Sequence, residues 1–294
     1  MKRKLALIFI STFCFILMAS CLVACNVVIT SADFKTTNHT VDPFSSIDID
    51  VDVSEIKLVK SADKQYAVTC YETDKYYHKV SVENGTLKIK SVSALGVNLN
   101  IGWAKSPEIT IYLSEDVYDS LKVSADTGAV SIDKGLTFGS VDIDTDTGAV
   151  DCSADITNTV DINTDTGAIR IDGITNASAI ELDTATAGVE MKNVNCSSLR
   201  INSDTGAVDL KNVISKTLFI AVSTGAVNLS QCNGSESIII STDTGSVTAT
   251  LLTSDRYFDI DCDMGLVNVP ASTEGGALVK VSVDMGSISI SYCN

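Results

Sequence analysis

A five-residue motif that recurs at near-constant spacing constrains this chain more than any other feature. It reads "DTGAV" in three copies and "DTGAI" or "DTGSV" in others, with looser versions toward the C-terminus. Aligned on the glycine, the copies are 19 to 21 residues apart and place Gly128, Gly148, Gly167, Ala187, Gly206, Gly225, Gly245, Gly265 and Gly286 in one column. Self-similarity at this period is typical of a solenoid, in which each repeat forms one coil.

The flanks of the motif alternate between apolar and polar residues. Apolar residues stand seven and five places before the glycine, and two and four places after it, in every copy. In the second copy these are Val141, Ile143, Val150 and Cys152. Period-two alternation predicts one strand before the turn and one after it, with one wet face. Glycine permits the turn and the Asp side chain can hydrogen-bond nearby backbone amides, so we interpret the motif as a corner.

We therefore predict an all-β fold, a single-stranded, right-handed-type β-solenoid of about nine coils of ~20 residues over residues 120–294. A row of antiparallel hairpins with "TG" at each tip is the alternative. Columns that are alike in shape as well as polarity favour in-register stacking. Apolar residues after the second strand are expected to close the other side of the coils, as at Leu136, Ile156, Ile174, Val194 and Val213.

A secretory signal precedes this fold. Residues 2–4 are basic and residues 5–17 are almost uninterrupted apolar, a run that suits a signal peptide and is short for a membrane-spanning helix. The stretch "LVAC", residues 22–25, resembles the bacterial lipobox, whereas "MASC", ending at Cys21, has Met in place of Leu. We expect removal of residues 1–24, lipidation of Cys25, and anchoring of the protein to the outer face of a bacterial membrane.

The mature chain is strongly acidic. The whole chain carries a net charge of −16, and cleavage removes three basic residues, which leaves 18 basic against 37 acidic residues and a charge of −19. Such a surface repels phosphates, so we expect no nucleic-acid partner. The charge suits an ectodomain, or one that collects cations.

Apart from the lipidated Cys25, six cysteines remain after cleavage, namely Cys70, Cys152, Cys196, Cys232, Cys262 and Cys293. No CxxC occurs, and His39 and His78 are the two histidines, so a zinc site is not expected. No two cysteines share a column in adjacent coils. We therefore expect buried free thiols rather than cross-coil disulfides.

The region before the repeats divides into a tether, residues 25–40, and a β-rich cap, residues 41–119. "IDIDVDVSEIKLV", residues 47–59, fits the repeat register with Ser54 in the glycine place, and "VENGTLKIK" predicts a hairpin about Asn84 and Gly85. These segments, followed by "ITIYLSEDVYDSLKVSADTGAVSI" and the "TGAV" repeats, resemble the bacterial putative-adhesin domain family of uncharacterised function over residues 44–294. The resemblance implies a β-solenoid surface domain with a role in adhesion or at the envelope, and it supplies no catalytic residues.

Asp-Thr-Gly is also the catalytic loop of aspartic proteases, in which two such carboxylates share a proton. Here the motif forms a row, and its Asp is replaced by Ala185 in one copy and by Ser223 in another. The two histidines leave no Ser-His-Asp set among the repeats. We expect a non-enzymatic protein without a cofactor. A solenoid enzyme that cleaves polysaccharides is the remote alternative.

Acidic residues line up on the expected wet face. In the second to fourth coils they are Asp142, Asp161 and Glu181, six places before the corner, and Asp144, Asn163 and Asp183, four places before it. Stacked like charges destabilise a sheet, and calcium could relieve this repulsion because carboxylate oxygens are its ligands. Solvation and salt screening are the alternative.

The same face is interrupted by apolar residues in the sixth and seventh coils. Phe219 and Ile239 stand where neighbouring copies have Arg200 and Asp259, and Ala221 extends the spot. The predicted patch is either a contact site or covered by the closing segment, residues 234–237. Together these features predict a lipid-anchored, extracytoplasmic protein that binds or senses an envelope or cell-surface ligand. A structural or calcium-binding rod without a macromolecular ligand is the alternative.

Overall fold

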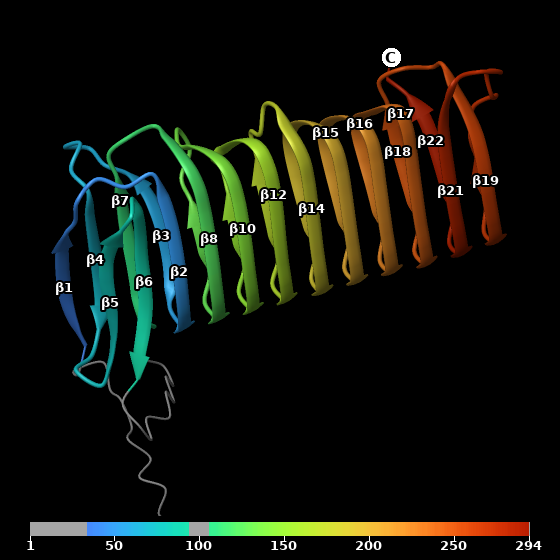
Figure 1. The fold of residues 1–294 in the computed structure, drawn as a ribbon. Helices are drawn as coiled ribbons and strands as arrows, with labels where there is room; N and C mark the ends of the chain where they lie inside the picture. Colours follow the sequence, from blue (N-terminus) through green and yellow to red (C-terminus); the bar gives the residue numbers. More distant parts are fainter. Residues whose placement is uncertain (1–33, 94–105, 294) are drawn as a thin grey trace, which may run out of the picture.

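The structure is a computed structural model that describes residues 34–93 and 106–293. The predicted lipidation site, Cys25, lies outside these residues. The described part contains strands and no helix, so no helix in it could cross a membrane. The strands stack into an elongated ladder (Figure 1). They are β1 (Lys35–Thr40), β2 (Ser46–Val53), β3 (Glu55–Lys60), β4 (Ala67–Glu72), β5 (Tyr76–Glu83), β6 (Thr86–Ser93), β7 (Glu108–Leu113), β8 (Val117–Thr127), β9 (Val130–Ile132), β10 (Thr137–Thr147), β11 (Val150–Cys152), β12 (Asp155–Thr166), β13 (Ile169–Asp172), β14 (Ala177–Thr186), β15 (Val189–Thr205), β16 (Val208–Thr224), β17 (Val227–Thr244), β18 (Val247–Leu251), β19 (Arg256–Met264), β20 (Val267–Asn268), β21 (Ala277–Met285) and β22 (Ile288–Tyr292).

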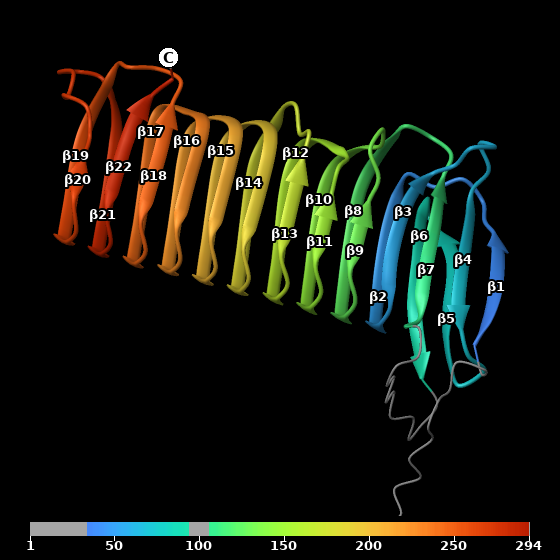
Figure 2. The same ribbon diagram turned by 180° about the vertical axis from the view of Figure 1, so that it is seen from behind.

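Each coil contributes one strand before its corner and one after it, and the two kinds of strand form two layers. The strands before the corners, β8, β10, β12 and β14, pair in parallel and in register, with Val141 opposite Leu121 and Val160. Strands β9, β11 and β13 form the second layer in the same way, as Figure 2 shows. Strands β15, β16 and β17 each run from one corner to the next without a break. The predicted in-register stacking is confirmed, and the hairpin alternative is wrong.

The core lies between the two layers. The four predicted apolar columns are buried in every copy except the eighth, and the five closing residues from Leu136 to Val213 are buried as well. In the eighth copy Phe258 and Ile260 are partly exposed, and 48% of Val267 is exposed. Removal of these columns from water is the main force that holds the coils together.

The corner glycines touch one another across coils. A Cβ added to Gly148 would lie 2.0 Å from the carbonyl oxygen of Gly128, and the same contact recurs along the solenoid. A carbon and an oxygen need about 3.3 Å, so a side chain between two such corners would force the coils apart. In the fourth coil, which has Ala187 in this place, β12 and β14 pair only as far as Thr164 and Thr184. Pairing between other neighbouring coils continues to the residue before the corner.

At the C-terminal end the coils do not follow one another in chain order. Strands β21 and β22 of the ninth copy pair with β17 and β18 of the seventh. The eighth copy, β19 and β20, lies outside them and pairs with β21 and β22. Figure 1 shows β21 between β17 and β19. The expected consecutive stacking is wrong here, because the loop of residues 269–276 carries the chain back inward. The eighth copy therefore lacks a coil on its far side.

The cap continues the solenoid at the other end. Strands β2 and β3 form a coil that pairs with β8 and β9, and Ser54 occupies the corner beside Gly128 as predicted. Strands β5 and β6 are the predicted hairpin, with positive φ at Asn84 and Gly85. Strand β4 runs antiparallel to β7 and to β1. Strand β1 lies within residues 25–40, which were expected to be a tether, so that expectation is wrong for Lys35–Thr40. This segment forms a strand through backbone hydrogen bonds to β4, and its polar composition gave no sign of that.

Candidate functional site

The outward positions of the strands before the corners form one continuous face. Six places before each corner, the side chains follow in the spatial order Asp48, Lys122, Asp142, Asp161, Glu181, Arg200, Phe219, Ile239, Lys280 and Asp259. This column contains both features predicted from the sequence, the acidic segment and the apolar patch. Lys122 and Arg200 flank the acidic segment, Asp142 to Glu181. Arg200 and Lys280 flank Phe219 and Ile239.

The structure brings the five predicted acidic residues, Asp142, Asp144, Asp161, Glu181 and Asp183, onto this face. Both ends of this acidic segment are ion-paired, since Lys122 Nζ lies 2.5 Å from Asp142 Oδ2 and Arg200 Nε lies 3.5 Å from Glu181 Oε1. Asn202 donates a 2.6 Å hydrogen bond to Asp183. Asp161 sits in the middle, where desolvation and the neighbouring carboxylates raise its pKa. The calcium hypothesis for this segment stays a prediction.

The apolar patch begins at Phe219, which lies opposite Ile239 in the sheet. Both side chains and Ala221 are partly exposed. The guanidinium of Arg200 lies over the Phe219 ring, 4.3 Å from its centroid, a cation–π contact. The other neighbour of Ile239 is Lys280, because the ninth copy is inserted at this point. The expectation that Asp259 borders the patch is therefore wrong.

The closing segment does not cover the patch. Gly234 pairs with Ser215 and Ser237 pairs with Thr217, so these residues lie in the sheet itself. The patch instead extends along the sheet, because Leu278 lies beside Ser237.

Tyr257, which is 50% exposed, lies beside Leu278 in turn. We call the five residues Phe219, Ala221, Ile239, Leu278 and Tyr257 the apolar patch. Sequence reasoning missed the last two because their proximity depends on the changed order of the coils.

The Asp of the corner motif is exposed in every copy that carries it. The corners form one line, so no two of these carboxylates face each other across a cleft. At Asp126, desolvation and the charges of Asp52 and Asp146 raise the pKa of the carboxyl group. A row of exposed carboxylates lacks the enclosed pair of an aspartic protease.

All six described cysteines are free thiols, as expected, but only four of them are buried, since Cys262 and Cys293 are partly exposed. Burial raises the pKa of Cys152 and of Cys232 to about 11. Thiols with so little thiolate at neutral pH are poor nucleophiles. These two act as small apolar residues in the core.

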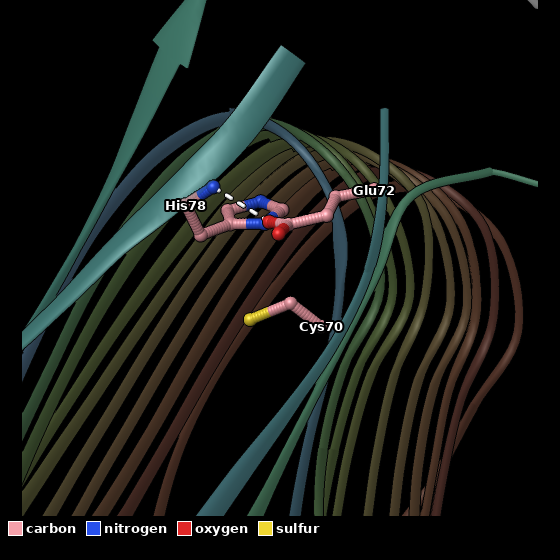
Figure 3. A group of neighbouring side chains, drawn as sticks. All are labelled: Cys70, Glu72 and His78. Carbon is pink, nitrogen blue, oxygen red and sulfur yellow. Dashed lines mark hydrogen bonds and ion pairs between the residues drawn. The ribbon is translucent and has the colours of Figure 1, made fainter. Parts of the chain in front are cut away.

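One cluster in the cap was not predicted. Within residues 34–93 and 106–293, one group of three potential metal ligands has its ligand atoms within 4.8 Å of one another, namely Cys70, Glu72 and His78. Figure 3 shows the three side chains turned toward one another, Cys70 and Glu72 from β4 and His78 from β5. They are 0%, 4% and 3% exposed. The signal in the sequence is Cys-x-Glu on one face of β4, with a histidine six residues after the Glu, on β5. A search for CxxC pairs does not detect this spacing.

His78 links this cluster to the first corner. Its Nε2 lies 2.8 Å from Ser54 Oγ, and its Nδ1 lies 3.1 Å from Glu72 Oε2. Ser, His and Glu in this order resemble a hydrolase triad, but Ser54 is 0% exposed, so its hydroxyl is out of reach of a substrate. Burial lowers the pKa of His78 against the opposing effect of Glu72. The three residues form a polar network inside the cap.

Comparison with known proteins agrees with this architecture. A search of curated proteins gave no match. A structure described as a putative adhesin from Parabacteroides merdae has 9% identity and a TM-score of 0.54, over 90% of this chain and 98% of that one. A "putative lipid binding protein" from Parabacteroides distasonis has 14% identity and a TM-score of 0.52, over 89% and 97%. A putative adhesin from Bacteroides fragilis has 17% identity and a TM-score of 0.48, over 88% and 97%.

For the two Parabacteroides structures, whose TM-scores exceed 0.5, identities this low show a shared fold alone. The family called Toastrack DUF4097 matches residues 44–185 and 175–294, which together include nearly all of the described residues. The chain belongs to the Toastrack DUF4097 family.

Proposed function

We propose that the protein is a lipid-anchored, extracytoplasmic bacterial surface protein that binds a partner at the envelope or on another cell, without catalysis. The lipid on Cys25 is the anchor, and the apolar patch is the binding surface. Two kinds of support come from outside the patch. The N-terminus has the signal and lipobox pattern, and proteins of the same fold are described as a "putative adhesin" and as a "putative lipid binding protein".

The observation that carries the proposal is the apolar patch on an otherwise polar face. Phe219 and Ile239 lie between two cations, Arg200 and Lys280. Lys280 Nζ lies 2.6 Å from Asp259 Oδ2, so this cation is held in place at the rim. Exposed apolar surface with a charged rim marks contact sites. The two flanking cations favour a partner that offers an apolar group beside anionic groups.

The test replaces Phe219 and Ile239 together by Ser. Binding of the lipid-free protein to isolated envelope membranes is measured by co-sedimentation, self-association by sedimentation velocity, and stability by thermal denaturation. We expect a variant with an unchanged melting temperature that has lost binding or self-association. The matched control is Thr217→Ser with Ser237→Ala, which changes the neighbouring outward positions of the same two strands. We expect this control to behave as wild type.

Two outcomes would contradict the proposal. Loss of several kcal/mol of stability, the size expected for emptying a buried aromatic site, would show that the patch is core. A stable double variant that binds and associates normally would favour a structural rod, the alternative function.

Absence of catalysis is tested at the corners. Single Asp→Asn changes at Asp126, Asp146 and Asp165 are expected to alter stability by similar small amounts, because the three positions are equivalent along the solenoid. A polysaccharide-cleaving solenoid enzyme would instead lose activity at one position. Release of reducing sugar from envelope polysaccharides is the readout that separates the two.

A further inference from the structure

The buried cluster in the cap brings three potential metal ligands together in one place. Cys70 Sγ, one oxygen of Glu72 and one ring nitrogen of His78 converge within 4.8 Å, all shielded from solvent. The distance of 3.1 Å between His78 Nδ1 and Glu72 Oε2 is close to the separation of two ligands on one tetrahedral zinc ion, about 3.3 Å for bonds of ~2.0–2.1 Å. Cys70 Sγ lies within 4.8 Å of both atoms, whereas a sulfur and a nitrogen or oxygen ligand on one tetrahedral zinc ion are about 3.6 Å apart for bonds of ~2.3 and ~2.0–2.1 Å. A movement of about 1 Å therefore closes the gap.

The hydrogen bonds of His78 allow this role. Ser54 Oγ donates to Val53 O at 2.5 Å and therefore can accept from an Nε2–H of His78. In that tautomer the Nδ1 lone pair faces the Glu72 carboxylate, and a cation between the two atoms resolves the conflict. In the other tautomer Nδ1–H donates to Glu72 and Ser54 donates to Nε2, which needs no cation. A ligating histidine generally donates its second N–H to an oxygen, and Ser54 is the oxygen in place.

Charge also favours a divalent ion. A carboxylate and a thiolate next to a neutral imidazole sum to two negative charges, so a divalent cation makes the buried site neutral. Isolated charges are expensive in an apolar interior, whereas a neutral coordinated set is tolerated.

A fourth ligand is available on the neighbouring strand. His39 on β1 lies opposite Val68, on the same inward face of the sheet as Cys70. Its Nε2 is buried and has no hydrogen-bond partner in the structure. The group whose ligand atoms all lie within 4.8 Å of one another does not include His39, so its ring must move inward to complete the set.

We propose that Cys70, Glu72 and His78 bind a divalent transition-metal ion of the zinc type, and that a movement of the His39 ring on β1 supplies the fourth ligand. Sulfur and imidazole ligands select zinc or its neighbours over calcium and magnesium, which prefer oxygen. The ion joins β4 to β5 directly and to the first corner through Ser54. It thereby fastens the cap to the solenoid. Entry is by opening of β1, an edge strand whose pairing partner is β4.

The experiment uses the purified mature protein after treatment with a chelator. Cobalt is added as a spectroscopic substitute for zinc, because a cobalt–thiolate bond gives a charge-transfer absorption. We expect one equivalent of cobalt to produce this band, zinc to displace it, and zinc to raise the melting temperature. Cys70→Ala is expected to abolish the band and the thermal shift.

The matched control is Cys196→Ala, which removes another buried cysteine. Burial raises the pKa of the Cys196 thiol to about 12. It has no histidine or carboxylate set around it and is expected to keep the band. Glu72→Gln preserves the side-chain volume and guards against misfolding of the cysteine variant. We expect it and His39→Gln each to weaken zinc binding by more than the ~10–100-fold that is typical of losing an outer-shell partner of a metal ligand.

Absence of a thiolate band in the wild type at stoichiometric cobalt would overturn the proposal. An unchanged band in Cys70→Ala would overturn it equally, because the thiolate would then belong to another cysteine. Unchanged zinc affinity in His39→Gln would remove His39 from the ligand set.

Discussion

Substitution of Ala for Gly148 is the sharpest test of the corner. The added Cβ would lie 2.0 Å from Gly128 O and 2.6 Å from its carbonyl carbon. To reach an ordinary contact of about 3.3 Å, the two coils must separate by about 1.3 Å at the corner. Two backbone hydrogen bonds join the coils there, from Gly128 N to Thr147 O and from Val130 N to Ala149 O, and each is 2.9 Å long. An increase of this size breaks them.

The free-energy cost follows from these contacts. Two lost hydrogen bonds contribute about 1 kcal/mol each, since water can reach the partly exposed corner, and the overpacking adds about 1–3 kcal/mol. We expect the free energy of unfolding to fall by about 3–5 kcal/mol. For a chain of this size the melting temperature falls by about 10 °C. Thermal and urea denaturation followed by circular dichroism measure both quantities.

The control is Ala149→Ser, one residue further along. Ser246 and Ser287 occupy the same place in other copies, so this change is expected to alter stability by less than about 0.5 kcal/mol. A Gly148→Ala variant within about 1 kcal/mol of wild type would refute the steric argument. The early end of pairing next to Ala187 would then need another explanation.

Three further predictions concern charge and anchoring. Asp161→Asn should raise the melting temperature at about pH 7: the raised pKa of Asp161 means that its charged form costs stability, a cost that disappears as pH falls through the folded-state pKa. Melting curves from about pH 7 down to about pH 4 should therefore converge for variant and wild type. Calcium should raise the melting temperature of the wild type above its value in sodium at matched ionic strength, and equal values would exclude coordination by the acidic segment. Cys25→Ser should release the protein from the membrane fraction or leave its signal uncleaved, whereas Cys21→Ser should leave it in place; the reverse result would assign the lipid to Cys21.

The repeating part of the fold was predictable because the same physical demand recurs in every coil. The apolar columns are buried as expected in every copy except the eighth, and Ser54 lies in the corner place assigned to it. The corner glycine could be identified without coordinates, since a place that holds glycine in most copies implies a close approach of backbone. The apolar pair Phe219 and Ile239 also followed from the register.

The tertiary structure alone decided the features that depend on which segments become neighbours. Each coil presents similar columns to both sides, so the repeat pattern alone does not reveal which copies become neighbours. The exchange of the eighth and ninth copies therefore placed Lys280 beside Ile239 and added Leu278 and Tyr257 to the apolar patch. The repeat in the sequence determined the shape of each coil, because the same residues are buried and the same corner contact is made in each repeat. The convergence of Cys70, Glu72 and His78 lay beyond it, because β4 and β5 meet through a single, unrepeated turn.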